Sequence, residues 1–118
     1  MSRNRTYIVI AALVLFVIGG GVLIYSTRSQ GGQNVTINLT VTGAGKMQPD
    51  NPSAHQNDTV TINVTSDAEG EVHLHGYDVH FDTKPGTTVS HTFKADKTGT
   101  FEIEWESTGT HLGDFVVS

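Results

Sequence analysis

Hydrophobic and polar residues alternate strictly in two parts of the chain. Residues 34–42 (NVTINLTVT) and 59–65 (TVTINVT) place valine, isoleucine or leucine at every second position, with asparagine or threonine between them. Successive side chains of a β-strand point to opposite faces of the sheet, so this alternation predicts two strands that are each buried on one side.

Further β-like runs follow as far as the C-terminus, and groups of turn-forming residues separate them. These runs cover residues 71–81, 87–93, 99–106 and 112–117. After residue 33 no segment has the apolar period of a helix. Short strands at regular spacing predict an all-β fold, specifically a small antiparallel Greek-key β-sandwich.

The beginning of the chain has a different pattern. Residues 7–25 (YIVIAALVLFVIGGGVLIY) carry no charge. At about 1.5 Å per residue they would cover roughly the 30 Å hydrocarbon core of a bilayer, which predicts one transmembrane helix acting as an uncleaved signal-anchor. A cleaved secretory signal is the alternative, but its apolar region normally runs about 7–15 residues.

The charges beside this segment predict its orientation. Arg3 and Arg5 precede it and Arg28 follows it, so the excess of positive charge places residues 1–6 in the cytoplasm. Residues 26–33 then form a short polar linker, and residues 34–118 form the β-domain outside the cytoplasm, at the cell surface or in the periplasm.

Composition excludes several classes of function. The chain contains no cysteine, so it has neither disulfides nor thiolate ligands, and its net charge is -5. An acidic domain is not expected to bind nucleic acid. None of the motifs for nucleophilic, phosphate-binding, zincin or dinucleotide chemistry occurs, so the chain is not expected to be an enzyme.

Four short motifs follow one another in the domain. They are NDTVT at 57–61, HGY at 75–77, FKADKTGTF at 93–101 and LGDFVV at 112–117. Their order and spacing resemble the cupredoxin family over nearly all of residues 34–118, and the segment around Met47 is similar to the family's opening. The resemblance implies a cupredoxin-like sandwich in which His75 stands at the position of the first copper ligand.

Three positions depart from the family's blue-copper pattern. Trp105 stands where the resemblance implies the cysteine ligand, Thr108 where it implies the second histidine, and His111 where it implies the axial methionine. A trigonal site of two histidines and a cysteine cannot be built from these residues. The resemblance therefore implies a cysteine-less, non-blue member.

The remaining candidates for metal ligands begin with a pair of histidines. His73 and His75 point to the same side of an extended strand, and imidazole pairs suit Cu(II), Zn(II) or Ni(II). The resemblance supplies His111 as the third ligand. We expect copper, with zinc as the alternative. Weaker candidates are a carboxylate from Glu106 or Glu104, the thioether of Met47, and Trp105 as a neighbour of Cu(I) through a cation-π contact.

The other histidines are not expected to bind the ion. In an unbroken strand His80 would face away from His73 and His75, unless Gly76 marks a bulge. His55 and His91 are expected at the surface.

Two interpretations remain open. In the first, the chain is a membrane-anchored extracytoplasmic module that binds copper for carriage, delivery or sensing, not for blue-copper electron transfer. In the second, the histidines are neutral residues of a vestigial site, and the chain is a metal-free sandwich for adhesion, scaffolding or recognition.

The alternation of side chains along a strand also predicts which residues gather on a surface of the domain. Glu102, Glu104 and Glu106 share one face of their strand and form an acidic stripe that can concentrate cations.

Acceptor patterns for N-glycosylation occur four times, at Asn34, Asn38, Asn57 and Asn63. The simpler interpretation is that these asparagines and threonines are the solvent-facing residues of strands.

Overall fold

The computed structural model describes residues 32–118, which cluster as one unit. The predicted cytoplasmic segment 1–6, the transmembrane helix 7–25 and most of the linker 26–33 therefore lie outside the described residues. Within residues 32–118 there is no helix with the length and apolarity needed to cross a membrane.

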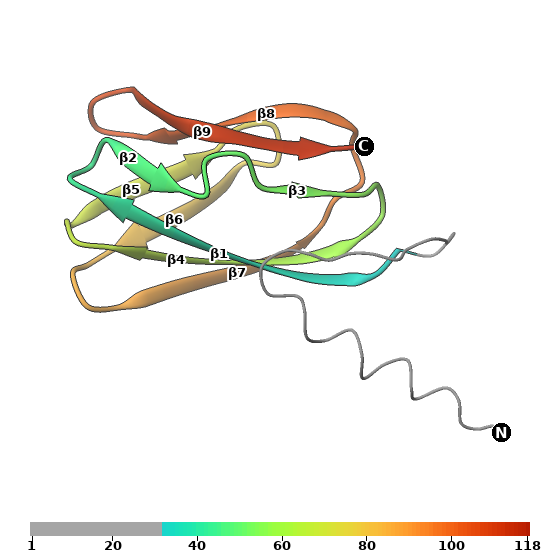
Figure 1. The fold of residues 1–118 in the computed structure, drawn as a ribbon, viewed down its shortest axis with the longest axis horizontal. Helices are drawn as coiled ribbons and strands as arrows, with labels where there is room; N and C mark the ends of the chain where they lie inside the picture. Colours follow the sequence, from blue (N-terminus) through green and yellow to red (C-terminus); the bar gives the residue numbers. More distant parts are fainter. Residues whose placement is uncertain (1–31) are drawn as a thin grey trace, which may run out of the picture. The chain divides into compact units, whose positions relative to one another are not determined.

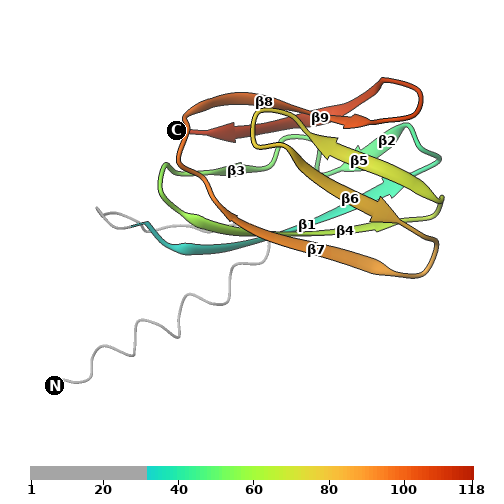
Figure 2. The same cartoon turned by 180° about the vertical axis from the view of Figure 1, so that it is seen from behind.

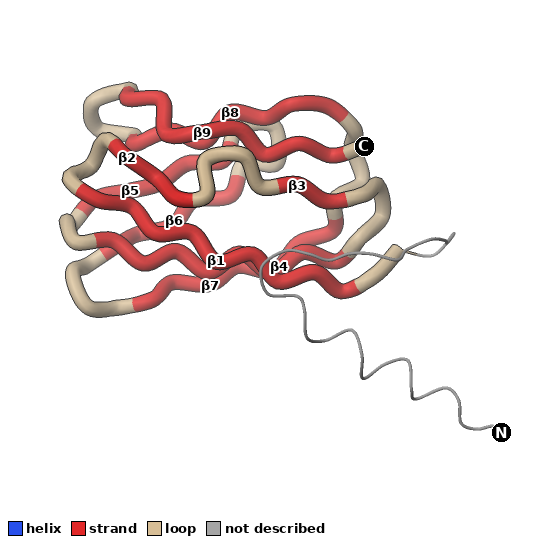
Figure 3. The backbone as a smooth tube through the Cα atoms, in the orientation of Figure 1, coloured by secondary structure: helices blue, strands red, loops and turns tan. Residues whose placement is uncertain are grey.

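The described part of the chain is built from nine strands (Figure 3). They are β1 (Asn34–Thr42), β2 (Lys46–Gln48), β3 (Ser53–Ala54), β4 (Thr59–Ser66), β5 (Gly70–Leu74), β6 (Val79–Thr83), β7 (Thr88–Lys94), β8 (Gly99–Trp105) and β9 (Thr110–Val117). The alternation in the sequence therefore predicted the long strands correctly. It missed β2 and β3, which are too short to show a period.

Two sheets lie face to face, as Figure 1 shows from one side and Figure 2 from behind. One sheet has the order β2-β1-β4-β7, and the other has the order β3-β9-β8-β5-β6. This confirms the all-β sandwich.

The sheets are mixed rather than purely antiparallel, which corrects the sequence-based prediction. β1 pairs with β4 in parallel, with Ile37 opposite Ile62, and β3 pairs with β9 in parallel. Parallel neighbours need a crossover connection. The chain between β1 and β4 supplies it, because β2 pairs back onto β1 whereas β3 joins the other sheet.

The run at residues 71–81, predicted as one strand, is a hairpin. β5 and β6 pair antiparallel, with His73 directly opposite His80. Gly76 and Asp78 have positive φ angles of 84° and 56° in the turn between them. Glycine adopts this conformation without steric cost, which explains why the chain can reverse here.

The core lies between the two sheets and takes the inward side of every long strand. Its largest fully buried side chains include Phe81, Phe115 and Leu39. At the edge of the core, the motifs at residues 57–61 and 93–101 contact each other. The Asn57 N–H donates to the Ala95 carbonyl at 2.7 Å, and the Ala95 N–H donates to the Asp58 carbonyl at 2.8 Å. These contacts join the turn before β4 to the chain leaving β7.

Candidate metal centre

The side of the five-stranded sheet that faces away from the core carries a concentration of histidines and carboxylates. Along β5, Val72 and Leu74 are buried while His73 between them is not, and β6 and β8 alternate in the same way. We call this surface the histidine–carboxylate face. It comprises Glu71, His73, His75, Asp78, His80, Asp82, Glu102, Glu104, Glu106, His111 and Asp114.

His73 and His75 meet on this face, as the sequence predicted. The backbone N–H of His75 donates to the Glu102 carbonyl at 2.9 Å, which extends the strand ladder beyond the end of β5. The two imidazole centroids lie 4.3 Å apart, and Nε2 of His75 lies 2.5 Å from Oε1 of Glu104. His73, His75 and Glu104 each offer one ligand atom, and these three atoms lie within 4.8 Å of one another.

His80 also belongs to this cluster, so the prediction that it faces away from His73 was wrong. Its ring stacks on that of His73 with centroids 4.1 Å apart and an interplanar angle of 11°. The physical reason is the hairpin, because residues directly opposite each other on antiparallel strands share a face. A bulge at Gly76, the alternative considered from the sequence, would also have moved His80 to the side of His73. The turn at Gly76 has this effect.

Carboxylates surround the two stacked rings. Nδ1 of His73 lies 3.1 Å from Oε1 of Glu106, and Nδ1 of His80 bonds to Glu71. On the other side of each ring, Oδ1 of Asp78 lies 3.4 Å from Nε2 of His73 and 3.1 Å from Nε2 of His80. Sequence reasoning missed Asp78, although its place in a glycine-containing turn beside the histidines was a usable signal.

His111 lies on the same face but not within the His73 cluster. It pairs with Glu104 across β8 and β9, beside a shift of strand register at Ile103 and Glu104. Its Nδ1 lies 3.0 Å from Oε2 of Glu102, and its Nε2 lies 3.5 Å from Asp114. The third ligand implied by the resemblance thus lies on β9, two strands away from β5, where Glu102 and Asp114 hold it.

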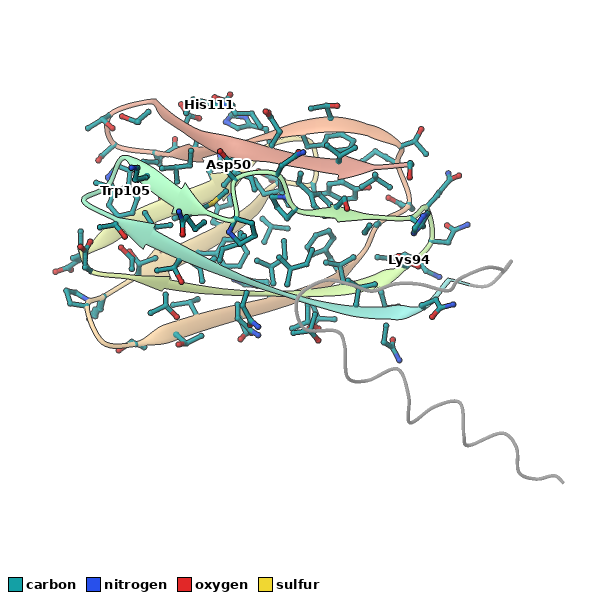
Figure 4. The ribbon with its side chains drawn as sticks, viewed as in Figure 1. Asp50, Lys94, Trp105 and His111 are labelled. Carbon is teal, nitrogen blue, oxygen red and sulfur yellow. The ribbon has the colours of Figure 1, made fainter. Side chains whose placement is uncertain are left out.

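Trp105 is a core residue and does not lie beside the histidines. Figure 4 labels it together with His111, which is exposed whereas Trp105 is only 3% exposed. The Trp105 ring packs across Gly70, where a Cβ atom would lie 2.2 Å from the ring. It therefore faces the side of the sheet opposite the histidines, where it cannot contact an ion on the histidine–carboxylate face.

The thioether of Met47 is likewise unsuited to the cluster. Met47 is only 3% exposed and lies on β2, the edge strand of the other sheet. Its methyl group packs so closely against Gly113 that a Cβ atom added there would lie 2.7 Å from Cε of Met47. With Trp105 at the cysteine position and Met47 in the core, the described residues do not fit a blue-copper centre.

The carboxylates change the protonation of two histidines on the face. Hydrogen bonding to Glu71, followed by Asp78, raises the pKa of His80, and hydrogen bonding to Glu102 raises the pKa of His111. In turn, hydrogen bonds from His80 and then His73 lower the pKa of Asp78. The lowered pKa keeps the Asp78 carboxylate ionised, which favours the binding of cations beside it.

The opposite surface of the sandwich contrasts with this face. On the four-stranded sheet the Asn63 side chain donates to Oδ1 of Asn38 at 2.9 Å, and Thr61 bonds to Thr92 at 2.8 Å across the strands. Three of the four asparagines in acceptor patterns lie on these strands, which agrees with their interpretation as solvent-facing residues. The chemistry of this domain is therefore concentrated on one of its two faces.

Comparison with known proteins identifies the fold. No protein-family model and no curated protein matches the sequence. Among solved structures, a chain of a heme-copper terminal oxidase dimer matches with a TM-score of 0.65 and 16% identity, covering 95% of this chain and 88% of that chain. A copper-binding protein solved in its apo form matches with a TM-score of 0.62 and 16% identity, covering 78% and 93%.

A third match is auracyanin A, a blue copper protein from the green photosynthetic bacterium Chloroflexus aurantiacus. Its TM-score is 0.54 at 17% identity, with 72% of this chain and 99% of that chain covered. At such identities the matches establish the fold alone. The domain is a cupredoxin-like sandwich, as the four motifs suggested.

Proposed function

We propose that this chain is a cupredoxin-like module that binds a divalent metal ion, copper first and zinc as the alternative, on its histidine–carboxylate face. One observation carries the proposal: His73, His75 and Glu104 present three ligand atoms within 4.8 Å of one another. We call this group the first site.

The donor set favours the divalent state of the ion. Two imidazoles and a carboxylate are borderline-to-hard ligands that suit Cu(II) and Zn(II), and Cu(II) is the tightest binder of the common divalent ions. Cu(I) prefers thiolate and thioether ligands, but the chain has no cysteine and Met47 is buried in the core. We therefore propose carriage, delivery or sensing of the ion rather than rapid electron transfer.

The charge of the face supports the same function. Apart from its four histidines, the face consists of seven carboxylates, which create a negative potential around the first site. A negative surface concentrates cations and raises their rate of association. The structural neighbours add further support, since one is a copper-binding protein and another a blue copper protein.

We further propose that the domain is tethered outside the cytoplasm by the uncharged segment 7–25. Support comes from the length of this segment and from the excess of arginine before it. The full chain should fractionate with membranes and resist carbonate extraction. A protease added to intact cells or spheroplasts should degrade the domain. A soluble chain lacking residues 1–25 would instead indicate cleavage.

A metal-free role is the competing proposal, and one observation favours it. All four histidines of the face already have a carboxylate partner, which could satisfy them without an ion. In that case the domain would serve adhesion, scaffolding or recognition.

Metal titration distinguishes the two proposals. The detergent-solubilised full chain is titrated with Cu(II) and Zn(II) in competition with chromophoric chelators of graded affinity. We expect one ion per chain, and a melting temperature that rises with metal concentration. Failure to compete with a weak chelator such as glycine would exclude the metal-binding proposal. The His55→Asn variant is the control, because His55 is exposed and lies outside the face.

A further inference from the structure

A second group of donor atoms shares His73 with the first site. His73, Asp78 and His80 also offer three ligand atoms within 4.8 Å of one another. The atoms that converge are Nε2 of His73, Nε2 of His80 and Oδ1 of Asp78, which lies 3.4 and 3.1 Å from the two nitrogens.

The carboxylates behind the rings select the tautomer that such a group needs. An ionised carboxylate only accepts hydrogen bonds, so Glu106 keeps the proton on Nδ1 of His73, and Glu71 keeps the proton on Nδ1 of His80. On the other side of each ring, Nε2 donates its own proton to Asp78, and an incoming ion would displace this proton and bind the Nε2 lone pair that is left. A carboxylate bonded to the far nitrogen of a ligating imidazole is a common arrangement around protein-bound metals.

We propose that His73, Asp78 and His80 form a second site for the same divalent ion, and that one ion occupies either site but not both. This inference rests on the proposed function and extends it. A neutral imidazole has one lone pair, so His73 can ligate an ion in only one of the two sites at a time.

The two sites differ in access to solvent. In the second site the Asp78 side chain is 85% exposed, whereas the Glu104 carboxylate of the first site is only 20% exposed. The second site is therefore the place where an ion enters and leaves, and the first site is where it is retained.

Movement of the ion between the sites is a simple exchange of ligands. The bonds to His75 and Glu104 break while bonds to His80 and Asp78 form, and His73 remains a ligand throughout. Both sites supply two imidazoles and one carboxylate, so the exchange changes neither the charge of the complex nor the oxidation state of the ion. The metal can pass to the surface without being released into water first.

Zn(II) is the probe for the test, because it is diamagnetic and permits NMR of the histidine side chains. The full chain in detergent is compared with three variants, His73→Asn, His75→Asn and His80→Asn, and with His55→Asn as control. Affinity and stoichiometry come from chelator competition. The ligating nitrogens come from long-range ¹H–¹⁵N spectra, and release is timed after adding excess chelator.

The expected results differ for each variant. The parent and His55→Asn bind one Zn(II), and His73→Asn loses affinity by about 100-fold or more because both sites lose a ligand. His75→Asn retains one weaker ion, with metal-dependent shifts at Nε2 of His73 and His80. His80→Asn keeps its affinity within about threefold but releases Zn(II) at least about tenfold more slowly.

Other results would overturn the inference in distinguishable ways. Two Zn(II) ions bound at once would show that the sites do not compete for His73. Complete loss of binding in His75→Asn would remove the second site while leaving the proposed function intact. An unchanged release rate in His80→Asn would remove its role in entry and exit. No Zn(II) or Cu(II) binding by the parent would reject the proposed function itself.

Discussion

His73 of β5 and His80 of β6 lie opposite each other across a hairpin, and their imidazole rings stack 4.1 Å apart. This contact depends on the turn between the strands, in which Gly76 has a φ angle of 84°. A Cβ atom at Gly76 would also lie 2.3 Å from Cδ1 of Phe101. The turn therefore determines both the stability of the hairpin and the geometry of the histidine cluster.

We predict that Gly76→Ala destabilises the domain more than Gly86→Ala does. Both glycines have positive φ angles, 84° and 82°, but the position of a Cβ at Gly86 has no neighbour within 4 Å. The conformational cost should be similar, about 1–2 kcal/mol in each case. The clash with Phe101 should add roughly 1–3 kcal/mol for Gly76→Ala alone. Urea unfolding of both variants measures the difference, and equal values would show that the Phe101 ring gives way.

Replacement of Trp105 should affect stability but not metal binding. Trp105 fills the core beside Gly70 and faces away from the histidines. Trp105→Phe is expected to lower the free energy of unfolding by about 1–3 kcal/mol. The Zn(II) affinity of the folded protein should stay within about twofold of the parent value, as measured by chelator competition. A marked loss of affinity in well-folded Trp105→Phe would place the ion near the position of the family's cysteine instead.

The carboxylates behind His73 and His80 should contribute to metal affinity without binding the ion. Glu106→Gln and Glu71→Gln replace the charged acceptors of the Nδ1 protons by neutral amides that can also turn their NH₂ group toward the ring, and each should weaken Zn(II) binding by about 10–100-fold. Glu102→Gln is the matched control, because it lies on the same face but bonds to His111. Equal weakening by all three substitutions would indicate a general effect of negative charge rather than orientation of the ligands.

His111 should titrate above the usual histidine range, mainly because of Glu102. Hydrogen bonding to Glu102 is the largest cause that raises the pKa of His111, and the contribution of Asp114 is smaller. NMR titration should therefore show a larger fall in the pKa of His111 for Glu102→Gln than for Asp114→Asn. The opposite order would show that His111 turns toward Asp114 in solution.

The raised pKa values of His80 and His111 also predict how stability depends on pH. A histidine whose pKa is higher in the folded state stabilises the fold fully below its unfolded pKa, near 6.5, and loses this contribution as the pH rises through the folded value. In the absence of metal, the His80→Asn variant should show a smaller loss of stability across this window than the parent. Thermal melts at a series of pH values measure it.

Local patterns in the sequence were sufficient for the strands and for one pair of ligands. Alternation predicted the long strands, because burial on one side of a sheet imposes a period of two residues. The same period placed His73 beside His75 and aligned the glutamates of β8 on one face. The motifs at residues 57–61 and 93–101 suggested a cupredoxin-like fold, and they meet in space through the bonds between Asn57, Asp58 and Ala95.

Tertiary structure decided which residues from different strands come together. The run at residues 71–81 looks like one strand, yet its turn folds His80 and Asp78 back onto His73. The parallel pairing of β1 with β4 and the side-chain hydrogen bond between His111 and Glu102 likewise depend on strand order and register. A period of two residues shows which side chains of one strand share a face, but it does not show which other strands lie beside that strand. The histidine pair was therefore determined by the sequence itself, whereas the carboxylates and the third imidazole around it were determined only by the fold.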